Sequence, residues 1–284
     1  MNLSRIRAVI LDLDGVVYLE DHLIAGAGSA IREMRRRGLK ALFVTNNATA
    51  TRREFAARLS GMGVPCAEAE VMNTGRAAAV FVRKRFGRGA RIYAVGEHGL
   101  ADEMRREGMP TVTVKSRAAW ERFHRARRRF AAVVVSFDRT LTYWELCGAH
   151  DALRRGAALI ACNLDPTWPI KGGDLPGTGA LVSLMERASG KVPLVIGKPS
   201  PVMFRQLMID HELKAAEALV VGDRLPIDIR AGRAAGSPTA LVLTGIDSRA
   251  DVARSPWKPD LVLKDLPALL KLPGLPFLPR VRRG

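Results

Sequence analysis

Two aspartates placed two residues apart are the first side chains along the chain that could carry chemistry. Asp12 and Asp14 follow the apolar run 8–11 directly, and Gly15 comes next. The two-residue period of a strand sends both side chains to the same side. Two carboxylates about 4 Å apart repel each other by roughly 4 kcal/mol at an intermediate dielectric, so the pair requires a cation or a shared proton. An isolated Asp-x-Asp before glycine is also common in turns, so this pair alone decides nothing.

Three more polar groups each follow another predicted strand. Thr45 and Asn46 offer a hydroxyl and an amide, which can hold phosphate oxygens. Lys198 offers an ammonium group that could neutralise a transferring phosphoryl group. Asp223, with Asp228 five residues later, adds the carboxylates that a Mg²⁺ site needs. Because ligands of open α/β sheets bind at the carboxyl ends of the strands, the four groups together favour a site for phosphate and metal.

Short apolar strands that alternate with helical segments must position these groups, and this alternation predicts a doubly wound parallel sheet. The pattern runs through both ends of the chain, with predicted strands at 8–11, 41–44, 194–196, 218–221 and 240–243. A helix is predicted over 29–37, because Ile31 and Met34 share a face and Gly38 supplies a stop signal.

The middle of the chain has strands and helices of its own. Its predicted strands are 92–95, 132–135 and 159–161, and a capping box from Thr142 to Glu145 predicts a helix start. We therefore expect an α/β fold, with a Rossmann-like, doubly wound parallel sheet as its core and an inserted α/β cap domain. The expected core comprises residues 1–78 and 179–284, and the expected cap comprises 79–178.

In order and spacing, the polar groups resemble the four motifs of the haloacid dehalogenase (HAD) superfamily. The matching segments are Asp12-x-Asp14-Gly15, Thr45-Asn46-Asn47, Gly197-Lys198-Pro199 and Gly222-Asp223-Arg224 with Asp228. The insertion between the second and third motifs further resembles subfamily IIA, which has a large α/β cap. NagD-like enzymes, 4-nitrophenylphosphatases, phosphoglycolate phosphatase and pyridoxal phosphatase belong to that subfamily. The resemblance covers nearly the whole chain.

The resemblance implies Mg²⁺-dependent hydrolysis of a phosphate monoester through a phospho-aspartate. Asp12 would be the nucleophile, and Asp14 would act first as general acid and then as general base. The remaining implied roles are phosphate binding by Thr45, Asn46 and Lys198, and Mg²⁺ binding by Asp12, the Asp14 carbonyl, Asp223 and Asp228. Pro226 and Ile227 stand where many relatives carry Asp-Thr, so the orientation of Asp228 is in question.

The resemblance also implies a small phosphorylated metabolite as substrate. In this subfamily the cap supplies a specificity loop, which here would lie between 163 and 178 and would include Asn163, Asp165 and Trp168. Trp168 could contact the leaving group or pack within the cap. Phosphoglycolate, glycerol phosphate, nucleotides, sugar phosphates and pyridoxal phosphate all stay open as substrates. Many members of the subfamily dimerise through the cap, and a homodimer stays open here.

The net charge of +17 raises the question of a nucleic-acid partner. The basic residues are spread over helix-like segments instead of forming one stripe with interleaved aromatics, which argues against that partner. Three widely spaced cysteines suit buried thiols in a reducing compartment. The apolar runs are far shorter than the roughly 20 residues that cross a bilayer, so we expect a cytoplasmic protein without a membrane partner.

Two other functions stay open from the sequence. The first is a phosphotransferase or mutase of the same superfamily, in which the aspartyl phosphate passes to an acceptor other than water. The second is a non-catalytic basic protein that binds nucleic acid or a partner, which the presence of both Asp12 and Asp14 disfavours.

Overall fold

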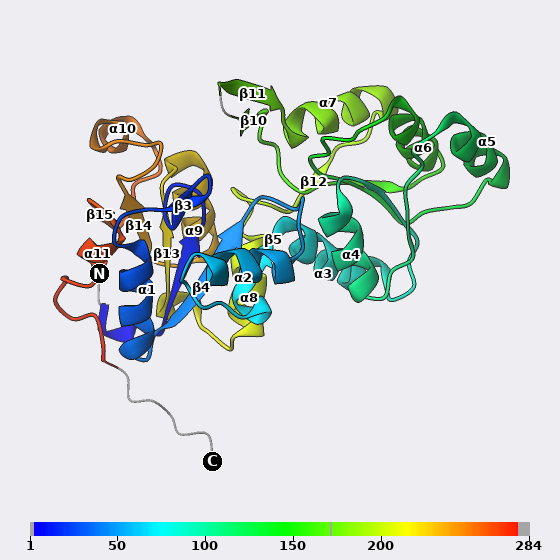
Figure 1. Cartoon of the computed structure of the whole chain (residues 1–284). Helices are drawn as coiled ribbons and strands as arrows, with labels where there is room; N and C mark the ends of the chain where they lie inside the picture. Colours follow the sequence, from blue (N-terminus) through cyan, green and yellow to red (C-terminus); the bar gives the residue numbers. More distant parts are fainter. Residues whose placement is uncertain (1–2, 171, 278–284) are drawn as a thin grey trace, which may run out of the picture. The chain divides into compact units, whose positions relative to one another are not determined.

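Figure 1 shows the fold as a computed structural model, which describes residues 3–170 and 172–277. Contacts divide the chain into two compact units. The first unit consists of Met1–Thr45, Arg53–Met72 and Lys198–Gly284, and the second consists of Asn46–Arg52 and Asn73–Gly197. The chain thus leaves the first unit and returns to it. The expected domain boundaries at 78 and 178 stay a prediction.

The first unit is built on a six-stranded sheet in the order β15-β14-β13-β1-β4-β5. Its strands are β1 (Ala8–Asp12), β4 (Lys40–Thr45), β5 (Val71–Asn73), β13 (Ala218–Gly222), β14 (Thr239–Val242) and β15 (Leu261–Leu263). The central strand β1 pairs in parallel with β13 and β4, and Asp12 lies opposite Val44. Residues 8–11 are fully buried, as expected of a strand covered on both faces. The parallel register brings the carboxyl ends of β1, β4 and β13 to one edge.

Helices flank this sheet (Figure 1). They are α1 (Ala27–Arg36), α2 (Arg52–Gly61), α8 (Val202–Asp210), α9 (Arg230–Ala235), α10 (Arg249–Arg254) and α11 (Leu266–Leu269), with short turns η1 (Leu3–Arg5), η2 (Glu68–Glu70), η3 (Ala215–Glu217) and η4 (Leu225–Ile229). A small antiparallel hairpin, β2 (Tyr18–Leu19) and β3 (His22–Leu23), follows β1. Ile31 and Met34 of α1 are fully buried, which confirms the predicted apolar face of that helix.

The second unit has its own five-stranded sheet in the order β12-β9-β8-β6-β7, with parallel pairing throughout. Its strands are β6 (Ile92–Val95), β7 (Thr111–Val112), β8 (Ala132–Val135), β9 (Ala158–Ala161) and β12 (Leu194–Val195), and its helices are α3 (Thr74–Phe86), α4 (His98–Arg106), α5 (Arg117–Ala126), α6 (Tyr143–Arg154) and α7 (Thr178–Ser189). A separate hairpin pairs β10 (Thr167–Ile170) with β11 (Gly173–Pro176). The predicted capping box of Thr142 and Glu145 begins α6. The predicted α/β core with an inserted α/β unit is therefore confirmed.

The edge strand β12 differs from its expected place. From the sequence we grouped 194–196 with the strands of the core sheet, but β12 pairs with β9 in the second sheet. β12 has only two residues and pairs on one side only, so its sequence has too little alternation of apolar and polar residues to identify the neighbouring strand. Among the described residues, no helix combines the length and the apolar character needed to cross a membrane.

Candidate active site

Three charged side chains meet at the carboxyl edge of the first sheet. Asp12 ends β1, and its Oδ1 lies 2.7 Å from the ammonium nitrogen of Lys198. The same ammonium donates to Asp228 Oδ1, also at 2.7 Å. The Lys198 side chain is 3% exposed, and the side chains of Asp12 and Asp228 are 12% and 1% exposed, so both ion pairs are largely shielded from bulk water. Lys198 thus bridges two aspartates that are more than 200 residues apart in sequence.

Asp223 completes a cluster of three carboxylates. It directly follows β13, and one oxygen each of Asp12, Asp223 and Asp228 lies within 4.8 Å of the others. With Lys198 the cluster carries a formal charge of −2, from three carboxylates and one ammonium. A buried charge of this sign and size favours a divalent cation. Mg²⁺ fits these residues because it binds through a small number of carboxylates and leaves positions for phosphate and water.

The pKa values of the clustered carboxyl groups reflect their burial and their repulsion of one another. Desolvation, followed by the charge of Asp228, raises the pKa of Asp12 well above its usual range against the opposing effect of Lys198. Desolvation and Asp228 also raise the pKa of Asp223, to about 6. Burial would lower the pKa of Lys198, but Asp12 and Asp228 outweigh that effect and raise it. The lysine therefore stays charged, while the carboxylates lack sufficient countercharge.

Asp14 lies in the turn that follows β1. Its side chain keeps an exposed face, yet partial desolvation raises its pKa, with Lys198 and Arg58 acting in the opposite direction. Gly15 follows in a left-handed conformation with φ of 76°, and a Cβ there would collide with the Asp223 carboxylate. Glycine at this position thus lets the turn lie against the Asp223 carboxylate.

The expected phosphate-binding residues fall into two groups. Thr45 is buried at the end of β4, one residue beyond the partner of Asp12. Asn46 belongs to the second unit, where its amide donates to Asp165 Oδ2 at 3.2 Å. The amide of Asn163 donates to the Asn46 carbonyl at 2.9 Å. The structure therefore brings Asn46 together with two of the expected specificity residues, a grouping that the sequence did not predict.

Trp168, the third expected specificity residue, lies on β10 and is half-buried. One face of its indole stacks on Phe137, with ring centroids 4.4 Å apart and an angle of 6° between the planes. Phe137 follows β8 and is itself buried. The stack on Phe137 fixes the orientation of the indole. The sequence could not show this contact, because 30 residues separate Phe137 from Trp168.

A loop after β14 hydrogen-bonds to the carboxylate cluster and was not predicted from the sequence. The Ile246 amide donates to Asp223 Oδ2 at 3.0 Å, and the Asp247 amide donates to the Asp223 carbonyl at 3.1 Å. In return, Asp247 Oδ2 accepts the amide of Leu225 at 2.5 Å. Asp247 thereby ties both ends of the segment 223–225. The sequence offered one sign of this role, because Asp247 follows the carboxyl end of the predicted core strand 240–243.

Asp228 keeps a defined orientation without the threonine that many relatives carry before it. Its Oδ2 accepts the amide of Arg224 at 3.1 Å, and its Oδ1 accepts from Lys198. Both carboxylate oxygens are thus occupied in the short π-helical turn η4. Although Pro226 and Ile227 replace the Asp-Thr of many relatives, the Arg224 amide and the Lys198 ammonium fix the orientation of Asp228.

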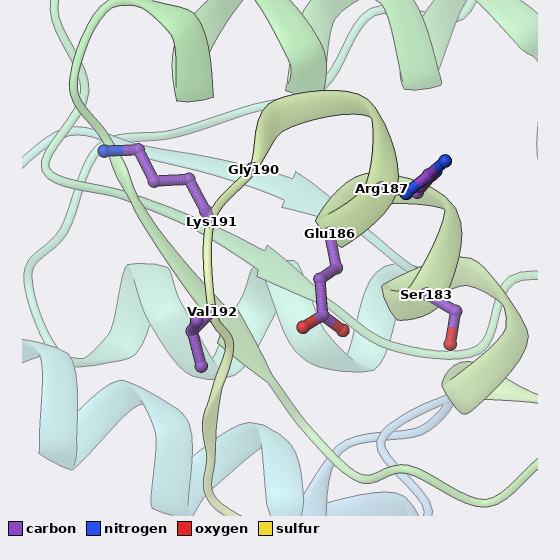
Figure 2. A pocket seen from close by; sticks show the side chains of 6 residues that line it. All are labelled: Ser183, Glu186, Arg187, Gly190, Lys191 and Val192. Carbon is purple, nitrogen blue, oxygen red and sulfur yellow. The ribbon is translucent and has the colours of Figure 1, made fainter.

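The second unit contains a shallow hollow beside α7, shown in Figure 2. Glu186 and Ser183 point to the same side of α7, while Lys191 extends away from them. The six lining residues offer one carboxylate and two cations, Arg187 and Lys191. This composition is typical of a solvated surface and does not suit a metal. The candidate active site is therefore the carboxyl edge of the first sheet.

Comparisons with known families agree with this placement. A model described as haloacid dehalogenase-like hydrolase matches residues 9–110, which include Asp12 and Thr45. A second, HAD-hydrolase-like model matches residues 195–269, which include Lys198 and Asp223. The two matches thus cover both halves of the cluster.

Individual proteins are similar over most of the chain. A D-glycerol 3-phosphate phosphatase of Mycobacterium tuberculosis is 35% identical over 92% of this chain and 70% of its own length. The sugar-phosphatase AraL of Bacillus subtilis is 31% identical over 93% of this chain and 92% of its own. The solved structure of NagD from E. coli K-12 superposes with a TM-score of 0.80 at 29% identity, over 92% of this chain and 97% of that one.

A solved glycerol phosphate phosphatase of Mycobacterium tuberculosis, in complex with calcium, superposes with a TM-score of 0.84 at 33% identity, over 95% of this chain and 76% of that one. Three of these four relatives, the two of Mycobacterium tuberculosis and AraL, are phosphatases by name, and the two solved structures superpose over more than nine-tenths of this chain. The chain therefore belongs to the haloacid dehalogenase-like hydrolases, as a phosphoric monoester hydrolase of subfamily IIA.

Proposed function

We propose that this enzyme hydrolyses a small-molecule phosphate monoester in a Mg²⁺-dependent reaction, through a phospho-aspartate on Asp12. The observation that carries the proposal is the bridge from Asp12 through Lys198 to Asp228, with Asp223 alongside. A cluster with a formal charge of −2 at the carboxyl end of β1 suits the binding of a metal ion together with a phosphoryl group.

Each residue has a distinct task in the proposed reaction. Asp12 attacks phosphorus in line, so that the P–O bond to the leaving group breaks as the bond to the Asp12 carboxylate forms. Asp14 donates its proton to the leaving oxygen and then takes a proton from the water that attacks the acyl phosphate. The raised pKa of Asp14 favours the protonated state that the first step needs. Inorganic phosphate leaves, and Asp12 is regenerated.

The charge of the transferring group needs compensation. The Lys198 ammonium, the Thr45 hydroxyl and the Asn46 amide would hold the phosphoryl oxygens. Asp12, the Asp14 carbonyl, Asp223 and Asp228 would hold Mg²⁺. When bound, the metal supplies positive charge to the phosphoryl oxygens and offsets the repulsion between the carboxylates.

For the substrate we propose a phosphate ester of a small metabolite, with glycerol phosphate and sugar phosphates as the first candidates. Relatives named for glycerol 3-phosphate and for sugar phosphates cover most of the chain. The experiment is a screen of phosphorylated metabolites with Mg²⁺, scored by released phosphate and repeated in excess chelator. Phosphate release that persists undiminished in chelator would remove the metal from the proposal.

Replacing Asp247 by alanine tests the support of the proposed metal site. The change leaves the Leu225 amide without its acceptor and frees the segment that presents Asp223. Loss of such a supporting contact typically costs about 10- to 100-fold in metal affinity, so the Mg²⁺ concentration for half-maximal activity should rise by about tenfold or more. Asp247→Asn keeps an acceptor oxygen and serves as the matched control. An unchanged Mg²⁺ titration of Asp247→Ala would show that the loop does not support the metal.

Replacing Trp168 by alanine tests its proposed role in the choice of leaving group. Because the indole is half-buried and one of its faces stacks on Phe137, we expect the ratio of kcat/KM between pyridoxal phosphate and phosphoglycolate to change by about tenfold. The thermal midpoint should fall only slightly. Trp144→Ala, which also removes a half-buried tryptophan from the second unit, should leave the ratio unchanged. A large loss of stability with the same substrate order would instead assign Trp168 to packing.

A further inference from the structure

Arg58 of α2 makes several contacts with one short hairpin, and none of the roles above explains them. Its guanidinium carbon lies 4.7 Å from the centroid of the Tyr18 ring, on β2. Its Nη2 donates to the Glu20 carbonyl at 2.6 Å and to Asp21 Oδ1 at 2.8 Å. Glu20 and Asp21 form the two-residue turn of the hairpin between β2 and β3. A single side chain thus contacts both the first strand and the turn.

One residue of the turn that Arg58 contacts has an unfavourable backbone conformation. Glu20 has φ of 51°, a left-handed conformation that non-glycine residues adopt uncommonly. Such a conformation persists only where the surroundings stabilise it. The Arg58 donor bonded to the Glu20 carbonyl supplies that stabilisation directly.

Main-chain hydrogen bonds also join the hairpin to residues 13–15, the turn that contains Asp14. The Gly15 amide donates to the Tyr18 carbonyl at 2.9 Å, and Asp14 forms a bridge with Tyr18. The Tyr18 amide donates to the Leu13 carbonyl at 3.1 Å. Tyr18 is 2% exposed, so its ring is held between the interior and the Arg58 guanidinium. A displacement of the hairpin would therefore move the backbone of Asp14 and Gly15.

We propose that Arg58 is a positioning residue, which clamps the β2–β3 hairpin and thereby holds Asp14 in its reactive place. The inference rests on the proposed function, in which Asp14 handles the proton and its carbonyl faces the metal. An ordinary surface ion pair would contribute little here, because the Asp21 side chain is 83% exposed. The guanidinium offers several donors on one planar group, so it can lie over the Tyr18 ring while it donates to the turn.

The test compares Arg58→Ala and Arg58→Lys with Arg53→Ala, a matched control that removes an exposed arginine from the same helix. One readout is kcat and KM for 4-nitrophenyl phosphate at saturating Mg²⁺. The other is cleavage of the native protein by a glutamate-specific protease after Glu20, followed by mass spectrometry of the peptide that begins at Asp21. The second readout requires no catalysis.

For Arg58→Ala we expect kcat to fall by about 10- to 100-fold with little change in KM, because small misplacements of a reacting group cost that much. Cleavage after Glu20 should accelerate by about tenfold, since the turn opens more often. Arg58→Lys retains the charge and should show both effects to a smaller degree. It also carries the test if the alanine variant does not fold.

Two results would overturn the clamp. Cleavage after Glu20 at the rate of Arg53→Ala would show that Arg58 does not hold the hairpin. Faster cleavage with an unchanged kcat would show that the hairpin does not position Asp14. If wild-type enzyme releases phosphate from no ester at all, the proposed function fails, whereas the cleavage rates still report on the clamp.

Discussion

Asp12→Asn is expected to abolish turnover and to leave the fold intact. The amide has nearly the shape of the carboxylate but is a poor nucleophile, so the covalent step has no substitute. Loss of a nucleophile can cost a factor of about 10⁶ in kcat, and we expect a fall of at least about 10⁴. The fold should tolerate the change, because it removes one of three carboxylates that repel one another.

The measurement is phosphate release under saturating Mg²⁺, with the thermal midpoint of the same preparation as the test of folding. Asp210→Asn, an exposed aspartate in α8, is the matched control and should behave as wild type. Turnover of Asp12→Asn within tenfold of the wild-type value would end the covalent account.

Lys198→Met is expected to damage both activity and stability. The ammonium neutralises the transferring phosphoryl group in the proposed reaction, and removing one such donor typically costs about 10²- to 10³-fold in kcat. The same change leaves Asp12 and Asp228 close together without their shared cation. Breaking a buried ion pair by removing one partner costs about 3–5 kcal/mol in unfolding free energy.

The pH dependence of that loss follows from the raised pKa of Asp12. A carboxyl group with a folded-state pKa above its unfolded value is most favourable to folding while it is protonated. Its contribution is lost as pH rises through the folded-state pKa. Since Lys198 opposes this shift in the wild type, Lys198→Met should be least stable at neutral and higher pH and should recover stability in acid.

Chemical denaturation across pH, without added metal, measures this effect. Lys271→Met removes an exposed lysine from the first unit and is the matched control. A variant at position 198 with wild-type stability at neutral pH would show that the ion pairs contribute little. Wild-type kcat in the same variant would exclude Lys198 from phosphoryl transfer.

The positions of Asp12 and Asp223 at strand ends could be predicted from the sequence, because a buried parallel strand is a continuous apolar run. The shared edge then followed from the rule that parallel strands end together. The partner of Lys198 could not be predicted, since both Asp12 and Asp228 lie far away in sequence and only the folded sheet brings them within 2.7 Å of its ammonium.

Contacts that depend on side-chain direction were harder to foresee. The pairing of Asn46 with Asp165, the stack of Trp168 on Phe137 and the clamp of Arg58 each join segments whose local patterns carry no sign of the other. The same holds for β12, whose two residues pair in the second sheet. Local pattern reports periodicity and burial, whereas these contacts depend on how elements pack.

The most direct measurement traps the proposed intermediate in an Asp14→Asn variant. This variant should still transfer phosphate from 4-nitrophenyl phosphate, whose leaving group needs no proton, but it should fail to activate the water that releases it. After Mg²⁺ and substrate are added, borohydride reduces an acyl phosphate, and mass spectrometry locates the reduced residue. We predict nearly one modified residue per chain, at position 12, and none in Asp12→Asn. A burst of nitrophenol without modification at position 12, or with modification elsewhere, would contradict a phospho-aspartate on Asp12.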